Sequence, residues 1–249
     1  MEMFDIILIG LILGFVATLY SSVGHGGASG YIAILAFFSL EPEAIRPIAL
    51  ALNVVVAGLA TYKFTKAGYL DWKSALPIIA ASMPLAFLGG TLTLPSDIYR
   101  PLLGALLVIS AGYMIWQVSM IHDRFETSKR KLPLVGSVSS GGAIGLASGL
   151  SGIGGGVLLS PLFVISGWAG ARQTAGIAAA FILFNSLAGL AGNIASVRNV
   201  PGELIFWAGL VFVGSIIGTG LGTKSLPVKP LVLLLAVAVF ISGVKFIWL

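Results

Sequence analysis

The chain has 249 residues, of which 57% are hydrophobic and 9% charged, and its mean hydropathy is +1.04. Soluble domains carry roughly 25% charged residues, so this composition predicts an all-α protein that crosses a membrane several times. The net charge of +5 fits the excess of Lys and Arg in cytoplasmic loops, and no basic stripe interleaved with aromatics indicates nucleic acid. The absence of cysteine excludes disulfides and thiolate metal sites.

Apolar blocks follow one another in the same order on either side of a charged stretch at 122–133. We therefore expect two internal repeats, at 1–121 and 134–249, joined by a cytoplasmic linker at 122–133. Short echoes support duplication, such as Asn53 in the third block and Asn185 in the eighth. The blocks are 4–20, 28–40, 45–62, 74–94 and 101–120, then 134–150, 157–167, 174–197, 204–222 and 231–248.

The second block of each half is too short to cross a membrane, because a spanning helix needs about 20 residues. Each short block follows a glycine-rich break, so break and flanks form either one discontinuous helix or a re-entrant hairpin. Each half then adds three transmembrane helices. Other glycines recur at helical spacing and predict close helix packing at Gly10 and Gly14, at Gly141, Gly145 and Gly149, and at Gly214, Gly218 and Gly222.

The distribution of Lys and Arg favours an inverted second half by a narrow margin. With re-entrant units the halves are inverted, and ten cations are cytoplasmic against four outside; with single crossings the halves are parallel and the split is nine to five. Inversion leaves only Arg46, Arg100, Arg198 and Lys245 outside. Trp168, Trp207 and Trp248 lie near block ends, as interface anchors do.

The two breaks themselves carry the chemistry that we expect to be functional. They are Ser21-Ser22-Val23-Gly24-His25-Gly26-Gly27 and Ser151-Gly152-Ile153-Gly154-Gly155-Gly156. A helix that begins after such a break presents unpaired amides and a positive dipole end, and short hydroxyls add donors, so the pattern indicates an anion site. The candidate substrate-binding residues are Ser21, Ser22, Gly24, His25, Gly26, Gly27, Asn53, Ser151, Gly152, Gly154, Gly155, Gly156 and Asn185.

Five side chains leave alternatives open. His25 either carries a coupling proton or is a neutral, structural histidine. The amides of Asn53 and Asn185 either line the site or bond across helices. Arg46 and Arg172 are candidates for attracting anions at the entrances, or they are ordinary solvated loop arginines.

The breaks resemble the two repeat signatures of the TauE/SafE membrane proteins. The first likeness is Ser21 to Tyr31 followed by Arg46-Pro47-Ile48-Ala49-Leu50-Ala51-Leu52-Asn53, and the second is Gly149 to Pro161. The resemblance implies a permease of the bacterial or archaeal inner membrane with about eight transmembrane segments, associated with sulfite, sulfoacetate and organosulfonates. His25 stands where the commoner Gly-x-Gly-Gly-Gly form has glycine, which suggests a subgroup.

The sequence and this resemblance together predict a secondary transporter of a small sulfur-containing anion that works by alternating access. No enzymatic motif, metal site or cofactor site is expected. The alternatives are an anion channel, an uptake permease for another small organic anion, or a structural membrane protein. The expected partners are the anion, the bilayer and protons as a candidate coupling ion, with a homodimer left open.

Overall fold

The structure is a computed structural model that describes residues 2–22, 25–120, 133–169, 171–194, 200–222 and 229–248. These residues form helices joined by short connections, without a strand among them, as the composition predicts. The first half contains α1 (Met3–Ser22), α2 (Ala28–Phe37), α3 (Pro42–Lys66), α4 (Trp72–Thr91) and α5 (Ser96–Met120). The second half contains α6 (Leu134–Ser151), α7 (Gly156–Ser166), α8 (Ala171–Gly192), α10 (Leu204–Gly222) and α11 (Lys229–Trp248).

Seven of the helices in the described part are long and apolar enough to cross a membrane. They are α1, α3, α4, α5, α6, α8 and α10, whereas α2 and α7 have 10 and 11 residues and are too short. The chain is therefore a multi-pass membrane protein. The expected linker at 122–133 lies outside the described residues except for Pro133.

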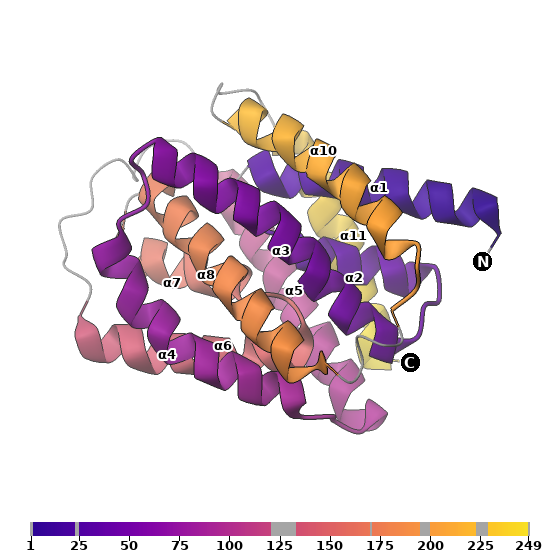
Figure 1. The fold of residues 1–249 in the computed structure, drawn as a ribbon, viewed down its shortest axis with the longest axis horizontal. Helices are drawn as coiled ribbons and strands as arrows, with labels where there is room; N and C mark the ends of the chain where they lie inside the picture. The colour runs from indigo at the N-terminus through magenta and orange to yellow at the C-terminus, as the bar shows by residue number, and fades with distance from the viewer. Residues whose placement is uncertain are drawn as a thin grey trace.

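The main helix pairs all join one half of the chain to the other. The most extensive packing is between α4 and α6, α1 and α10, α5 and α11, α4 and α8, and α3 and α8. Figure 1 shows α3 and α8 side by side, with α1 and α10 along one edge of the molecule and α4 and α6 along the opposite edge. Each half thus completes its packing only against the other.

The helix directions agree with an inverted second half. α3 and α8 are antiparallel, because Gly58 faces Leu183 while Gly189 faces Leu50. α5 and α11 are likewise antiparallel, and the two chain ends lie at the same end of the helices (Figure 1). Equivalent helices of parallel halves would run in the same direction. The duplication of the sequence itself stays a prediction.

Most of the glycines that we predicted to pack lie against neighbouring backbone, whereas Gly10 meets side chains of α10. A Cβ placed on Gly141 would lie 2.6 Å from the carbonyl oxygen of Ile78 on α4, and Gly145 and Gly149 repeat this contact one and two turns on. Gly218 of α10 approaches the backbone of Thr18 on α1 in the same way. A small-residue surface lets helix axes approach closely in a membrane, so these glycines set the α4–α6 and α1–α10 spacing.

One of the three tryptophans expected at the interface lies elsewhere. Trp207 is completely buried, and its Nε1 donates a hydrogen bond to the carbonyl oxygen of Ile6 at 3.0 Å. The expectation of an interface anchor at Trp207 is therefore wrong, because the indole joins α10 to α1 inside the protein. Trp248 is 83% exposed, as an anchor would be.

The packing surfaces give a matched pair of substitutions on α10. Gly218→Ala introduces a methyl group against the Thr18 carbonyl, and overpacking of this kind costs about 1–3 kcal/mol. Gly209→Ala meets no atom within 4 Å and gains about 0.8–1 kcal/mol of helix propensity. Thermal melting in detergent is expected to show a lower midpoint for Gly218→Ala and an equal or higher one for Gly209→Ala. Equal midpoints would contradict the packing role.

Candidate functional site

The first break turns the chain back on itself. α1 ends at Ser22, and α2 starts after Gly27, whose φ of 97° lies in the left-handed region that favours glycine. A Cβ on Gly30 would lie 2.6 Å from Val16, so the start of α2 returns alongside the end of α1. The break is thus a re-entrant hairpin, one of the two predicted forms. The candidate Gly24 lies outside the described residues.

The second break is also a hairpin. Gly152 ends α6 with a φ of 79°, and Gly154 and Gly155 follow with φ of 79° and 77°. Gly136 near the start of α6 faces Trp168 just beyond the end of α7, so α7 returns to the side of the membrane from which α6 enters. Three left-handed residues so close together require glycine, which explains the composition of this segment.

The two breaks meet around side chains from the centres of α3 and α8. A Cβ on Gly26 would lie 2.7 Å from Oδ1 of Asn53 and 2.9 Å from Cγ2 of Ile182. A Cβ on Gly154 would overlap Nδ2 of the same Asn53 and lie 3.1 Å from the same Ile182 carbon. Asn53 also donates a long hydrogen bond of 3.4 Å to the carbonyl oxygen of Ile153. The structure thus brings both breaks to one place, with Asn53 between them.

Several buried polar atoms on the elements that form the breaks have no hydrogen-bond partner among the described residues. Burial of such a group without a partner costs about 1–3 kcal/mol, so each one calls for an explanation. Ser186 faces Gly154, Ser148 faces Gly155, and Asn185 lies on the same side of α8 as Ile182. The atoms are Ser21 Oγ, Tyr31 OH, Asn53 Oδ1, Ser148 Oγ, Asn185 Oδ1 and Nδ2, and Ser186 Oγ.

Other candidate hydroxyls are engaged locally. Ser151 donates to the carbonyl oxygen of Ala147 at 2.7 Å and accepts from the amide of Ile153 at 3.2 Å, which stabilises the turn at the end of α6. Ser22 donates to the carbonyl oxygen of Leu19 at 2.7 Å. These two serines shape the breaks, whereas Ser21 presents a hydroxyl without a partner in the described chain.

A tyrosine of α5 lies between the first break and α7. The ring of Tyr113 lies 6.0 Å from the ring of His25, and its hydroxyl interacts with the side chain of Ser160 in the second turn of α7. Tyr113 also packs against Trp116, one turn on along α5, at 5.9 Å between ring centroids. His25 is 6% exposed, so it lies inside the protein at the first break. Tyr113 of α5 therefore lies beside His25 of the first break and beside the second turn of α7.

The electrostatic surroundings suit an anion. Among the described residues no Asp or Glu is buried, whereas Arg46 is buried at 7% exposure. The amino end of α2 has no side-chain cap, so its first amides and the positive end of its dipole point into the break. In the described ranges no three His, Cys, Asp or Glu side chains are grouped to hold a metal ion. The groups available to bind an anion here are therefore neutral hydrogen-bond donors and the amino end of α2.

The two arginines proposed at the entrances differ in their environments. Arg46 lies in the first turns of α3 and donates to the carbonyl oxygens of Gly89 at 2.5 Å and Leu92 at 3.0 Å, at the carboxyl end of α4. It is therefore not a solvated loop residue. Arg172 is exposed at the start of α8, where it donates to the hydroxyl of Tyr69 at 3.0 Å and lies over that ring.

Four residues of this region were missing from the sequence-based candidates. Tyr31, Ser148 and Ser186 present hydroxyls without a partner in the described chain, and Tyr113 lies beside His25 and Ser160. Ser186 adjoins the candidate Asn185, and Ser148 lies one turn before Ser151, so helical spacing offered a signal for these two. Nothing in the sequence places Tyr113 of α5 beside the breaks.

Substitution of Arg46 and of Arg172 should affect stability to different extents. Arg46→Gln removes charge-assisted bonds to two carbonyls, each worth about 1.5–3 kcal/mol, and is expected to lower the thermal midpoint strongly. Arg172→Gln removes a surface contact and should change stability by at most about 0.5 kcal/mol. Fluorescence-detected size-exclusion after heating measures both. A stable Arg46→Gln protein would show that Arg46 does not anchor α4.

Comparison with known proteins identifies the family. The family model described as "Sulfite exporter TauE/SafE" matches residues 6–246. A probable membrane transporter protein of Sinorhizobium fredii is 38% identical over 242 residues, covering 96% of this chain and 98% of its own length. Another, of Methanocaldococcus jannaschii, is 27% identical over 194 residues, covering 74% of this chain and 70% of its own. No solved structure matches significantly. The chain therefore belongs to the TauE/SafE family of membrane transporters.

Proposed function

We propose that this transporter carries a small sulfur-containing anion, such as sulfite, sulfoacetate or another organosulfonate, across the cytoplasmic membrane of a bacterium or archaeon. The observation that supports this most directly is the set of unpartnered polar atoms around Asn53 and the two breaks. A sulfur oxyanion presents several acceptor oxygens that need donors from different directions. Hydroxyls, amides and an uncapped helix end supply them, and no buried carboxylate in the described chain opposes the charge.

The arrangement of the two halves of the chain suggests how the site opens to each side of the membrane in turn. Inverted halves that meet at a site near the middle of the membrane are typical of alternating access, in which one part rocks against the other. The α5–α11 pair packs closely on itself and meets the other helices mainly through α2 and α7. Because α2 and α7 carry the amino ends at the breaks, movement of this unit would change access to the bound anion.

The ends of the helices support a proposed orientation. Lys63, Lys66, Lys73 and Arg172 all lie where α3 ends and α4 and α8 begin. By the positive-inside rule we propose that this end faces the cytoplasm, and we propose the same side for the charged linker at 122–133. The two chain ends then face outward.

A substitution in α8 separates a binding role from a structural one. Asn185→Leu replaces an unpartnered buried amide by an apolar group of similar size, so folding stability should stay equal or rise. Loss of a bond to the anion should weaken its binding by about 1.5–3 kcal/mol, or roughly ten- to hundredfold. Uptake of sulfite and of sulfoacetate into proteoliposomes, beside thermal melting, measures both quantities.

Ser215→Ala is the matched control for Asn185→Leu. Ser215 is equally buried, but its hydroxyl bonds within α10 to the carbonyl oxygen of Phe212, away from the breaks. It should transport normally. Normal transport by Asn185→Leu would remove Asn185 from the site. Flux that neither saturates nor exchanges with anion on the far side would indicate a channel.

His25 is the proposed proton carrier at the first break. His25→Gln keeps hydrogen-bonding capacity but does not titrate, so stimulation of uptake by an imposed proton gradient should disappear while exchange of labelled for unlabelled anion continues. The measurement compares both activities in the same proteoliposomes. Undiminished stimulation in His25→Gln would assign proton coupling to another group or to none.

A further inference from the structure

Two buried tyrosines lie near the amino end of α2 and use their hydroxyls differently. Tyr20, near the end of α1, forms a hydrogen bond of 2.6 Å with Oγ of Ser29 and another with the backbone amide of Gly30. Tyr31, in the first turns of α2, is completely buried, and its hydroxyl has no hydrogen-bond partner among the described residues. Burial of a hydroxyl without a partner lowers stability, so the hydroxyl of Tyr31 calls for an explanation.

The hydroxyl of Tyr31 lies at the first break. A Cβ on Gly27 would lie 2.6 Å from both Cζ and the hydroxyl oxygen of Tyr31. Helix side chains lean toward the amino end, which explains why Tyr31 reaches back over the residue that precedes α2. No side chain caps this end, and the first amides of a helix, here those of Ala28 and Ser29, have no partner within it. The hydroxyl and these amides therefore lie at the same end of α2.

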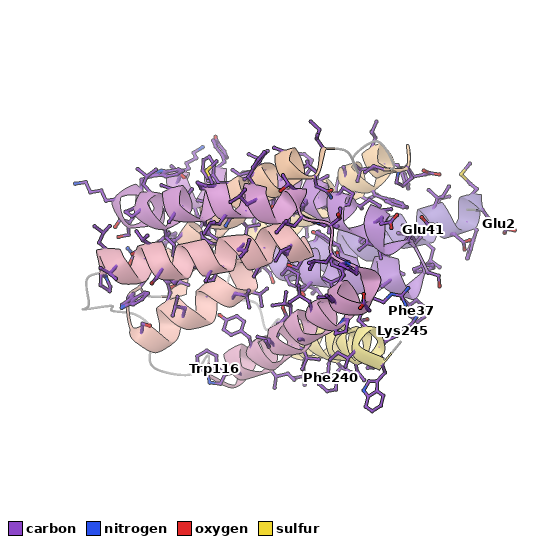
Figure 2. All side chains as sticks on the ribbon, turned by 90° about the horizontal axis from the view of Figure 1, so that it is seen from below. Glu2, Phe37, Glu41, Trp116, Phe240 and Lys245 are labelled. Carbon is purple, nitrogen blue, oxygen red and sulfur yellow. The ribbon has the colours of Figure 1, made fainter. Side chains whose placement is uncertain are left out.

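α2 runs from the interior of the protein toward its surface. Phe37, the last residue of α2, is 72% exposed, and Figure 2 shows it toward the same end of the molecule as Glu41 and Lys245. Residues 25–33, which include the first break from His25 on and the first turns of α2, are all buried. The positive end of the α2 dipole is thus inside the protein, where water screens it little.

The amino end of α7 does not offer the same groups. Ser160 follows Gly156 by four residues, as Tyr31 follows Gly27, but its Oγ donates to the carbonyl oxygen of Gly156 at 2.9 Å. The hydroxyl at this position of α7 is therefore engaged within its own helix. The two breaks are chemically unequal, because in the described chain the hydroxyl over the start of the short helix is free at the first break and bonded at the second.

We propose that the oxyanion group of the transported substrate binds at the amino end of α2. Tyr31 donates its hydroxyl to one oxygen of this group, and the amides of Ala28 and Ser29 donate to the others. The hydroxyl thereby gains the partner that the protein does not supply. The rest of the substrate extends toward Asn53, which contacts both breaks. This inference rests on the proposed function and assigns recognition of the negative charge to the first break.

Tyr31→Phe tests the assignment, because it removes the hydroxyl and keeps the ring. The thermal midpoint should stay equal or rise, since the hydroxyl has no partner in the described protein. The half-saturation concentration for uptake of sulfite and of sulfoacetate into proteoliposomes should rise about tenfold or more. Stabilisation of the detergent-solubilised protein by each anion should weaken in parallel, which measures binding without transport.

Ser160→Ala is the matched control at the corresponding position of α7. Its thermal midpoint should fall, because Tyr113 loses its contact with Ser160, while the half-saturation concentrations should stay at the wild-type values. The two variants are thus expected to separate stability from anion binding in opposite ways.

The wild-type protein distinguishes failure of this inference from failure of the proposed function. If wild type binds and transports the anions, unchanged half-saturation in Tyr31→Phe, or an equal rise in Ser160→Ala, would overturn the assignment to α2 and leave the proposed function standing. If wild type shows neither saturable uptake of these anions nor stabilisation by them, the proposed function is overturned and this inference with it.

Discussion

Hydrocarbon offers no hydrogen bonds to a polypeptide backbone, and this constraint decides where the two breaks lie. Gly26 and Gly154 are non-helical residues beside Asn53 near the middle of α3, so they must be covered by protein. Asn53 and Ile182 provide the cover, since each contacts both breaks. The glycines then let backbone approach these side chains with no Cβ between. The glycines leave space beside the backbone of the breaks, and the side chains of Asn53 and Ile182 occupy that space.

The polar groups at this meeting point are under the same constraint. An unpartnered hydroxyl or amide inside a membrane protein lowers stability, and a sequence selected only for folding would replace it. Ser148, Asn185 and Ser186 lie together near the second break, and Ser21 and Tyr31 lie near the first. Ser151 differs from these residues, because its hydroxyl has two hydrogen-bond partners and stabilises the turn at the end of α6.

Local patterns predicted much of this molecule. Block lengths revealed the short helices α2 and α7, and glycine spacing revealed the α4–α6 and α1–α10 contacts. The breaks and Asn53 were found because their polarity is out of place in apolar sequence. Tyr113 was missed because an aromatic residue in an apolar helix carries no such signal, and its contact with His25 depends on where α5 packs. Burial of Trp207 and Arg46 likewise depends on tertiary contacts that the sequence does not display.

The pairing of helices across the two halves also bears on how the protein is made. α1, α3, α4 and α5 leave the ribosome first, and their main partners α10, α8, α6 and α11 are synthesised afterwards. During that interval Gly14 and the carbonyls of Ile78, Ser82 and Ala86 face lipid in place of a neighbouring helix. The first half is therefore inserted before it can fold. Its helices depend on their hydrophobicity alone to stay in the membrane until the second half arrives and interleaves with them.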